Sequence, residues 1–123
     1  AGCALLGLPA RIVGVSADER ADDLAAIVAR LLDGMAERLG GRPASLGADR
    51  PIVVDDTQAG EGYGVPTAAS IEAASLLARR EGVVVDPVYT SKALAGLIAH
   101  VRAGTLRRDQ TVLFWHTGGQ PLA

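Results

Sequence analysis

The sequence predicts an α/β fold, with a mostly parallel sheet covered by helices on both faces. Short β-branched apolar segments alternate with longer segments of helical periodicity, in the order strand, helix, strand, helix, strand, helix, strand. The strand segments are apolar almost throughout, which is typical of parallel strands that are buried on both faces. Hydrophobic residues make up 49% of the 123 residues, enough for a packed core in one domain.

The first predicted strand and helix lie between residues 11 and 40. Residues 11–16 are short, apolar and β-branched, which indicates a buried strand. Asp18 follows as the expected N-cap of a helix. Apolar residues then recur at helical spacing from Leu24 to Leu39, and Gly40 and Gly41 end the helix.

The middle of the chain predicts a second strand and a second helix. Residues 42–50 hold glycine, proline and polar groups and indicate a loop, and residues 51–56 indicate another buried strand. Residues 60–66 form a glycine-rich turn. The alanine-rich segment 67–80 predicts a helix, which Gly82 closes.

The last third of the chain repeats this alternation. Residues 83–87 predict a third strand, and residues 91–103 predict a third helix that ends at Gly104. Residues 111–115 predict a fourth strand.

Composition excludes several classes of protein. The formal net charge is −2, no basic stripe is present and aromatic residues are only 3%, which argues against a nucleic-acid binder. No apolar stretch is long enough to span a membrane. The single cysteine, Cys3, excludes an internal disulfide and a multi-cysteine metal site.

Polar side chains are concentrated where the predicted strands end. In parallel α/β sheets ligands bind at the carboxyl ends of the strands. Those ends carry Ser16, Asp55 with Asp56, residues 86–90 and residues 116–119. We therefore expect a binding site along this edge of the sheet.

Two tyrosines lie near these ends. Tyr63 stands at the centre of the glycine-rich turn, which either presents its hydroxyl group to a pocket or is an ordinary surface turn. Tyr89 either points at the site or packs as an amphipathic core residue. The turn is not a Walker-type phosphate loop, because no Lys-Ser/Thr pair follows its glycines.

The remaining polar residues permit two interpretations each. Thr90 or Ser91 can cap the third helix, and the free amides there can hold an anion. Lys92 lies in the first helical turn, the unfavourable end for a cation. An anionic ligand nearby would explain a lysine at this end, but a lysine extended into water is the simpler interpretation.

Thr117 could offer a hydroxyl group to a cofactor. His116 could act as a base, although a structural role is favoured because the sequence shows no triad partner.

The sequence predicts no metal site. His100 falls in mid-helix and is expected to be solvated, and two isolated histidines do not make a zinc site. Asp55 and Asp56 could bind Mg²⁺, but capping of a strand end explains them more simply.

Three segments carry a resemblance to a known family. In chain order, they are the glycine-rich turn at residues 62–66 (GYGVP), the segment around Tyr89 at residues 89–97 (YTSKALAGL) and the closing segment at residues 113–119 (LFWHTGG). Together they resemble the C-terminal part of the D-cysteine desulfhydrase and 1-aminocyclopropane-1-carboxylate deaminase family. These are pyridoxal-phosphate enzymes of the tryptophan-synthase-β fold type. The resemblance covers essentially all 123 residues.

The resemblance implies a role for each candidate residue. Tyr63 and Tyr89 would be catalytic and would face the substrate and cofactor from two loops. Tyr89, Thr90, Thr117 and Gly118 would bind the cofactor, with the Thr117 hydroxyl by the pyridine nitrogen. A hydroxyl group there, in place of a carboxylate, would leave that nitrogen less protonated and weaken the ring as an electron sink.

The resemblance favours the desulfhydrase branch. The deaminase branch has a glutamate at the position of Thr90 and an apolar residue at that of Thr117. The implied reaction converts D-cysteine, a small D-amino acid, to pyruvate, sulfide and ammonia. The alternatives are 1-aminocyclopropane-1-carboxylate deaminase and a non-catalytic α/β domain or relic.

The resemblance also implies that residues 1–123 are a single C-terminal segment of a larger cofactor-binding domain. The Schiff-base lysine and the phosphate loop would lie upstream, and residues 1–4 resemble the helix that follows that loop. Lys92 aligns with a different lysine, Ser91 replaces a usual glycine, and Thr67 stands where asparagine is common. We therefore expect the segment alone to be inactive, and its parent to be a cytoplasmic homodimer with no nucleic-acid or membrane partner.

Overall fold

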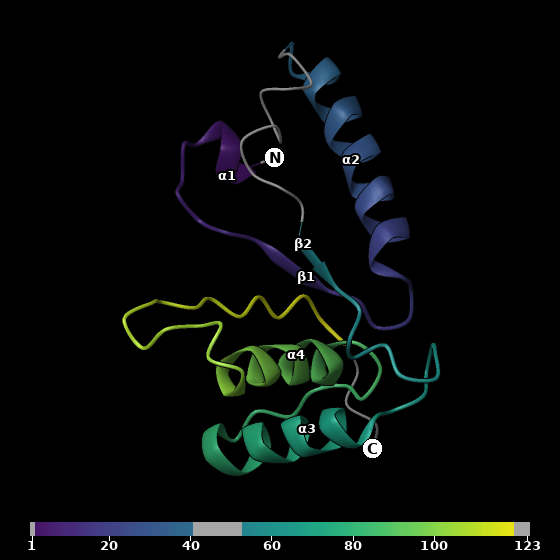
Figure 1. Ribbon diagram of the computed structural model, residues 1–123, viewed down its shortest axis with the longest axis vertical. Helices are drawn as coiled ribbons and strands as arrows, with labels where there is room; N and C mark the ends of the chain where they lie inside the picture. The colour runs from purple at the N-terminus through teal and green to yellow at the C-terminus, as the bar shows by residue number, and fades with distance from the viewer. Residues whose placement is uncertain (1, 41–52, 120–123) are drawn as a thin grey trace. The chain divides into compact units, whose positions relative to one another are not determined.

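The computed structural model describes residues 2–40 and 53–119 (Figure 1). The helices in these residues are α1 (Gly2–Leu5), α2 (Ala21–Arg38), α3 (Ala68–Glu81) and α4 (Thr90–Arg102). The strands are β1 (Val13–Val15) and β2 (Val53–Asp55), which pair with each other in parallel. The predicted α/β class and its parallel strands are thereby confirmed. The predicted loop 42–50 and residues 41, 51 and 52 lie outside the described residues.

The chain divides into two compact units. One unit comprises Ala1–Gly14 and Arg20–Val54, and the other comprises Val15–Glu19 and Asp55–Ala123. The second unit holds α3, α4 and the segments that follow the two strands. All the residues that the sequence singled out as catalytic or cofactor-binding belong to this second unit.

The start of α2 differs from the prediction. The N-cap is Arg20, which makes no side-chain capping bond, so the expectation that Asp18 caps this helix is wrong. Instead, the Ser16 hydroxyl donates to the Glu19 carbonyl at 2.7 Å and accepts from the Asp18 amide at 3.3 Å. This hydroxyl folds residues 16–19 into a turn ahead of the helix. At the other end, Gly40 takes a φ of 68°, as the predicted stop requires.

Helix α3 has both of its predicted ends. Thr67 is the N-cap, and its hydroxyl accepts from the Ser70 amide at 3.0 Å. The Ser70 hydroxyl accepts from the Thr67 amide at 2.9 Å, which completes a reciprocal capping box. Gly82 then ends the helix in the left-handed conformation, at φ 69°.

Helices α3 and α4 pack side by side and form the core of the second unit (Figure 1). The buried residues of this core are Ala73, Leu94 and Ala95, and the half-buried residues Leu77, Leu97, Ile98 and Phe114 pack against them. Gly96 brings α4 against Val15 at the end of β1, because a Cβ atom at Gly96 would lie 2.9 Å from a Val15 methyl group. The core thereby holds the N-terminal end of α4 next to the segment that follows β1.

Two predicted strands do not form in the described residues. Residues 83–87 and 111–115 have the expected apolar, β-branched composition, but neither is hydrogen-bonded into a ladder. A strand exists only through bonds to a neighbouring strand, and the described residues offer these two segments none. Their apolar side chains are correspondingly open, with Val84, Leu113 and Trp115 exposed by 62%, 78% and 76%.

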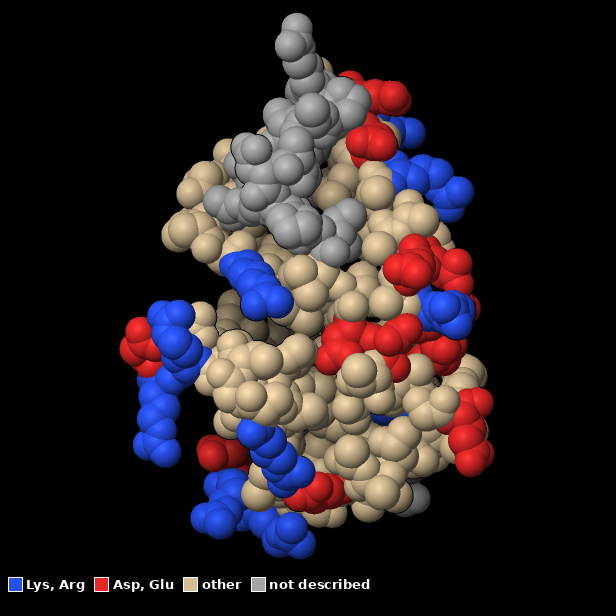
Figure 2. All heavy atoms as spheres, viewed as in Figure 1, with Lys and Arg blue, Asp and Glu red and all other residues tan. Residues whose placement is uncertain are grey.

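Charged side chains are mixed on the molecular surface. Figure 2 shows acidic and basic residues interleaved on the face it draws, without a large basic area among the described residues. No helix in residues 2–40 and 53–119 is long and apolar enough to cross a membrane.

Candidate functional site

The two tyrosines meet. The Tyr89 hydroxyl donates a hydrogen bond of 2.7 Å to the Tyr63 hydroxyl, and the rings pack edge to face with centroids 5.7 Å apart. Tyr63 comes from the glycine-rich turn, and Tyr89 is the N-cap of α4. Both remain open to solvent, with exposed fractions of 64% and 51%. Tyr89 is therefore not a core residue, and the turn presents Tyr63 to a second phenol.

The surroundings of Tyr89 keep its phenol protonated. The hydrogen bond to Tyr63 is the largest cause that raises the pKa of Tyr89 above 10.0, followed by burial and by the charge of Tyr63. The negative charges of Asp18 and Asp86 act in the same direction. Tyr89 is consequently a hydrogen-bond donor, not a phenolate, at neutral pH.

Asp86 organises the start of α4. Its Oδ1 atom accepts from the amides of Val88 and Tyr89 at 3.0 and 2.6 Å, and its Oδ2 atom accepts from the Thr90 amide at 3.0 Å. The prediction that Thr90 or Ser91 caps this helix is therefore wrong. Both lie inside the helix, and the buried Ser91 hydroxyl has no hydrogen-bond partner among the described residues.

The Asp86 carboxylate is stabilised by what it binds. Burial raises the pKa of Asp86, but the Thr90 side chain and the amides of Tyr89, Thr90 and Val88 together bring that pKa below its usual 3.8. Only 4% of the residue is exposed. The sequence signal for this role was an Asp-Pro pair just before a helix, which is typical of a side chain that caps a turn.

Thr90 connects α4 to the closing segment. Its hydroxyl donates to the Gly118 carbonyl at 2.9 Å, and the Gly118 amide donates to His116 Nδ1 at 3.1 Å. Thr117 lies between these two residues and is exposed. Gly119 packs directly against the Asp86 carboxylate, where a Cβ atom would overlap the oxygen. The predicted residues Thr90, Thr117 and Gly118 are thus brought together.

Lys92 is not extended into water, so the simpler interpretation of this residue is wrong. It is fully buried, at 0% exposure. Its Nζ atom donates to the carbonyl oxygens of Ala17 and Ala59 at 2.7 Å each and of Gly62 at 3.0 Å. Sequence position alone could not reveal this, because the three acceptors are backbone atoms from distant parts of the chain.

The ends of the two strands lie together, as predicted. The Ser16 amide donates to the Asp55 carbonyl at 2.7 Å, continuing the pairing of β1 with β2. Ala17 and Ala59, just beyond these ends, share the Lys92 ammonium group. The site is therefore built at the carboxyl edge of the paired strands.

His100 is bound rather than solvated, which corrects the expectation for this residue. Its Nε2 atom lies 3.0 Å from Asp55 Oδ2, and its Nδ1 atom lies 3.0 Å from the Thr105 hydroxyl. Burial raises the pKa of Asp55, but hydrogen bonds from Thr57 and the nearby His100 bring it below 3.8. Across residues 2–40 and 53–119, no group of three or more histidine, cysteine or acidic side chains could hold a metal ion.

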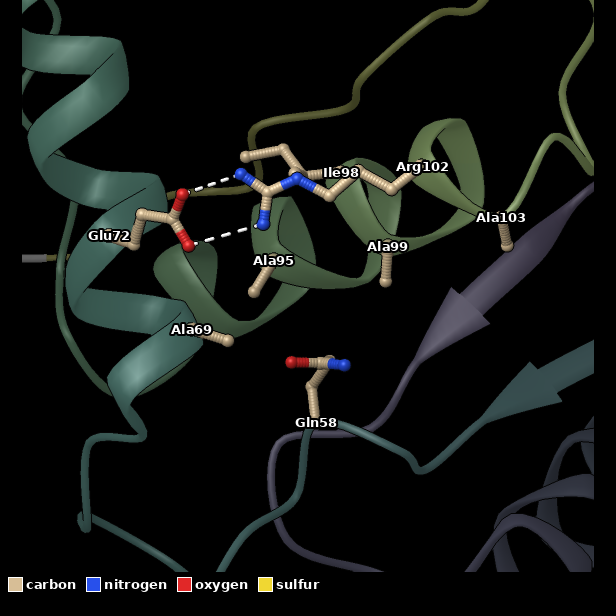
Figure 3. A pocket seen from close by; sticks show the side chains of 8 residues that line it. All are labelled: Gln58, Ala69, Glu72, Ala95, Ile98, Ala99, Arg102 and Ala103. Atoms are coloured by element: carbon tan, nitrogen blue, oxygen red, sulfur yellow. Dashed lines mark hydrogen bonds and ion pairs between the residues drawn. The ribbon is translucent and has the colours of Figure 1, made fainter.

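A separate pocket of about 400 Å³ lies along α3 and α4 (Figure 3). Small side chains line it, and Gln58 reaches it from the segment after β2. Glu72 and Arg102 pair across the two helices in a bidentate contact of 2.5 and 3.2 Å. The lining residues are Gln58, Ala69, Glu72, Ala95, Ile98, Ala99, Arg102 and Ala103. Neither tyrosine contributes to this pocket.

Two comparisons relate the chain to known proteins. Residues 1–118 match the family described as pyridoxal-phosphate dependent enzyme. Among solved structures, the chain is similar to an ACC deaminase homologue, with 29% sequence identity and a TM-score of 0.71. The match covers 84% of this chain and 30% of that one, so this chain spans about a third of the solved relative's length.

Proposed function

Since the chain belongs to the family of pyridoxal-phosphate-dependent enzymes, we propose that it forms one wall of the active site of a lyase. The proposed reaction converts D-cysteine to pyruvate, sulfide and ammonia. When bound, pyridoxal phosphate supplies an electron sink that stabilises negative charge on the substrate's α-carbon. The observation that carries the proposal is the pair of exposed, hydrogen-bonded phenols of Tyr63 and Tyr89.

The described residues fit the ring of this cofactor but not its covalent attachment. Tyr89 and Thr117 offer exposed, neutral hydroxyl groups, and the buried Thr90 holds Gly118 in place. The backbone at Gly118 is open, since a Cβ atom there would meet nothing within 4 Å. A neutral partner at the pyridine nitrogen suits an elimination that needs only a moderate electron sink. Lys92 is the only lysine of the chain, and its amine is already bound by three carbonyl groups. The Schiff-base lysine and the phosphate site would therefore belong to other parts of the enzyme.

The hydrogen-bond direction assigns different tasks to the two phenols. We assign Tyr89 as the donor of the hydrogen bond to Tyr63 Oη, which leaves the Tyr63 hydrogen to point at a substrate. As the carbon–sulfur bond breaks, the sulfur atom takes a proton from Tyr63 Oη and leaves as hydrogen sulfide. Tyr63 takes a proton from Tyr89, and Tyr89 regains one from water. Because its raised pKa makes Tyr89 the weaker acid, this second proton moves only once Tyr63 has become a phenolate.

The test is an assay of the full enzyme with D-cysteine, in which pyruvate and sulfide are measured together. We expect Tyr63→Phe and Tyr89→Phe to lower kcat roughly 100-fold, the usual effect of removing a general acid. Thr105→Val is the matched control, because it removes a hydroxyl group that binds His100 and no tyrosine. Wild-type rates in both phenylalanine variants would refute the assigned roles.

A second candidate reaction is the deamination of 1-aminocyclopropane-1-carboxylate. The solved relative is described as an ACC deaminase homologue, which favours this candidate. The hydroxyl groups of Thr90 and Thr117 support the desulfhydrase instead, because the deaminase branch has a glutamate at the position of Thr90 and an apolar residue at that of Thr117. Ammonia from the cyclopropane substrate, with no sulfide from D-cysteine, would select the deaminase. No product from either substrate would select the non-catalytic alternative.

A further inference from the structure

The ammonium group of Lys92 is bound entirely by backbone carbonyl groups. An ammonium group has three N–H donors, and the carbonyl oxygens of Ala17, Ala59 and Gly62 accept all three at 2.7, 2.7 and 3.0 Å. No described carboxylate forms an ion pair with it. Burial of an unpaired cation costs several kcal/mol unless dipoles of this kind replace its water. The three carbonyl oxygens thus form a cage for a small cation.

The cage connects the segments that carry the site. Ala17 follows β1, Ala59 follows β2, and Gly62 directly precedes Tyr63 in the glycine-rich turn. On the other side, Lys92 lies three residues after Tyr89 on α4. One side chain therefore joins the backbone next to the first phenol to the helix that starts at the second.

Other hydrogen bonds hold the Tyr63 turn only locally. Within residues 56–66, the Ala59 amide donates to the Asp56 carbonyl at 3.1 Å and the Val65 amide donates to the Gly62 carbonyl at 3.4 Å. The contacts that tie this turn to α4 are the Lys92 cage and the exposed phenol pair itself. The position of the Tyr63 hydroxyl then depends on the cation beneath it.

We propose that Lys92 is a positioning residue that acts as a tethered monovalent cation, holding the Tyr63 turn against α4 so that the two phenols meet. The role of Lys92 in the reaction rests on the proposed function. The binding of its ammonium group by the cage does not depend on that function, because carbonyl oxygens bind free monovalent cations in the same way. Removal of the lysine side chain leaves a cage that a free ammonium ion can fill.

The experiment compares three variants of the full enzyme. Lys92→Ala empties the cage, Lys92→Met removes the charge but fills the space, and Arg102→Met removes an exposed charge from the same helix as a control. Each is measured in ammonium chloride and in tetramethylammonium chloride, whose cation is too large for the cage, at equal ionic strength. The measured quantities are kcat and KM, the pKa of Tyr89 and the melting temperature.

We expect Lys92→Ala to lose about 100-fold in kcat, with a smaller change in KM, because misplaced reacting groups chiefly slow the chemical step. The pKa of Tyr89 should fall in this variant, since its hydrogen bond to Tyr63 is lost. Ammonium, but not tetramethylammonium, should restore both quantities and raise the melting temperature. Lys92→Met should be impaired without rescue, and Arg102→Met should resemble the wild type.

Two results would overturn the proposal. One is a folded Lys92→Ala variant with the wild-type kcat and the wild-type Tyr89 pKa. The other is an impaired Lys92→Ala variant that ammonium does not restore, including one that stays unfolded in ammonium. An inactive wild type would refute the lyase function alone, because the Tyr89 pKa and the ammonium-dependent melting temperature would still decide the role of Lys92.

Discussion

The shared hydrogen bond between Tyr63 and Tyr89 leads to a titration experiment. Because this bond is the largest cause of the raised Tyr89 pKa, Tyr63→Phe should lower that pKa toward 10.0. The chain has only two tyrosines, so the variant leaves Tyr89 as its single phenol. Titration by ultraviolet difference absorbance measures it directly.

A matched variant separates the hydrogen bond from charge. Asp18→Asn removes one of the weaker causes and should lower the Tyr89 pKa by less than Tyr63→Phe does. An unchanged Tyr89 pKa in Tyr63→Phe would contradict the hydrogen bond as the main cause.

Asp86 makes the stability of the protein depend on pH in the acidic range. Its pKa in the folded state is below 3.8, so its contribution is complete above that value and is lost as the pH falls through the folded pKa. Asp86→Asn leaves the Thr90 amide without its acceptor. We expect this variant to lose about 1–2 kcal/mol in the free energy of unfolding near neutral pH.

The measurement is chemical denaturation at neutral pH and again below pH 3.8. The difference in the free energy of unfolding between Asp86→Asn and the wild type should be smaller at the lower pH, because the wild-type carboxylate is then becoming protonated. Asp33→Asn, at an exposed position in α2, is the control and should change little at either pH. If this difference in the free energy of unfolding is the same at both pH values, the charge of Asp86 is not the source of its stabilising effect.

Helix α4 shows how packing can reverse a helix propensity. Gly→Ala in a helix interior normally stabilises it by about 1 kcal/mol. At Gly96, however, the new methyl group would lie 2.9 and 3.0 Å from the two methyl groups of Val15. Valine has little freedom to rotate away, so Gly96→Ala should destabilise the protein by about 1–3 kcal/mol.

Gly34 provides the comparison within the same chain. It lies in α2 with nothing within 4 Å of its would-be Cβ atom, so Gly34→Ala should stabilise the protein by about 1 kcal/mol. Both variants are measured by denaturant unfolding. Equal stabilisation by the two changes would show that α4 does not approach β1 as closely as described.

The ends of elements were predictable where their signals are local. Gly40 and Gly82 were predicted correctly as helix ends because each acts on neighbouring residues. Asp18 was chosen wrongly because the Ser16 hydroxyl holds residues 16–19 in a turn, and the helix begins only at Ala21. The prediction of strands at residues 83–87 and 111–115 was wrong for a different reason. An apolar, β-branched composition favours strand pairing, but it does not determine whether a neighbouring strand is present.

At the scale of the whole molecule, the sequence indicated residues that the structure brings together but not the contacts that hold them. The resemblance selected Tyr63, Tyr89, Thr90, Thr117 and Gly118, and the geometry brings the two tyrosines together and Thr90 to Gly118. The residues beneath them were missed. The burial of Lys92 follows from contacts across 30 to 75 positions, which no local pattern encodes.

The environment of Lys92 also predicts how the chain behaves toward pyridoxal phosphate. A Schiff base needs a free amine, but all three Nζ donors of this lysine are bound and the side chain is fully buried. We expect no adduct on Lys92 after the folded chain is mixed with the cofactor and reduced with borohydride. Mass spectrometry of peptides checks this.

The same mixture in denaturant is the control, where the released lysine should become labelled. An adduct on Lys92 in the folded protein would mean that the cage opens readily, contrary to the burial described. Such a result would also reopen Lys92 as a cofactor lysine.

The reach of the Lys92 contacts has a consequence for the order of folding. Helices α3 and α4 are neighbours in the chain and can form their hairpin early, since short connections close at little entropic cost. The bond from Lys92 to Ala17 spans 75 positions, and contacts of such separation form late. A folding intermediate would therefore hold the helical hairpin with the lysine still in water. The bonds from Lys92 to Ala59 and Gly62, which hold the Tyr63 turn, span only 33 and 30 positions, so we expect the phenols to meet before the end of β1 completes the cage.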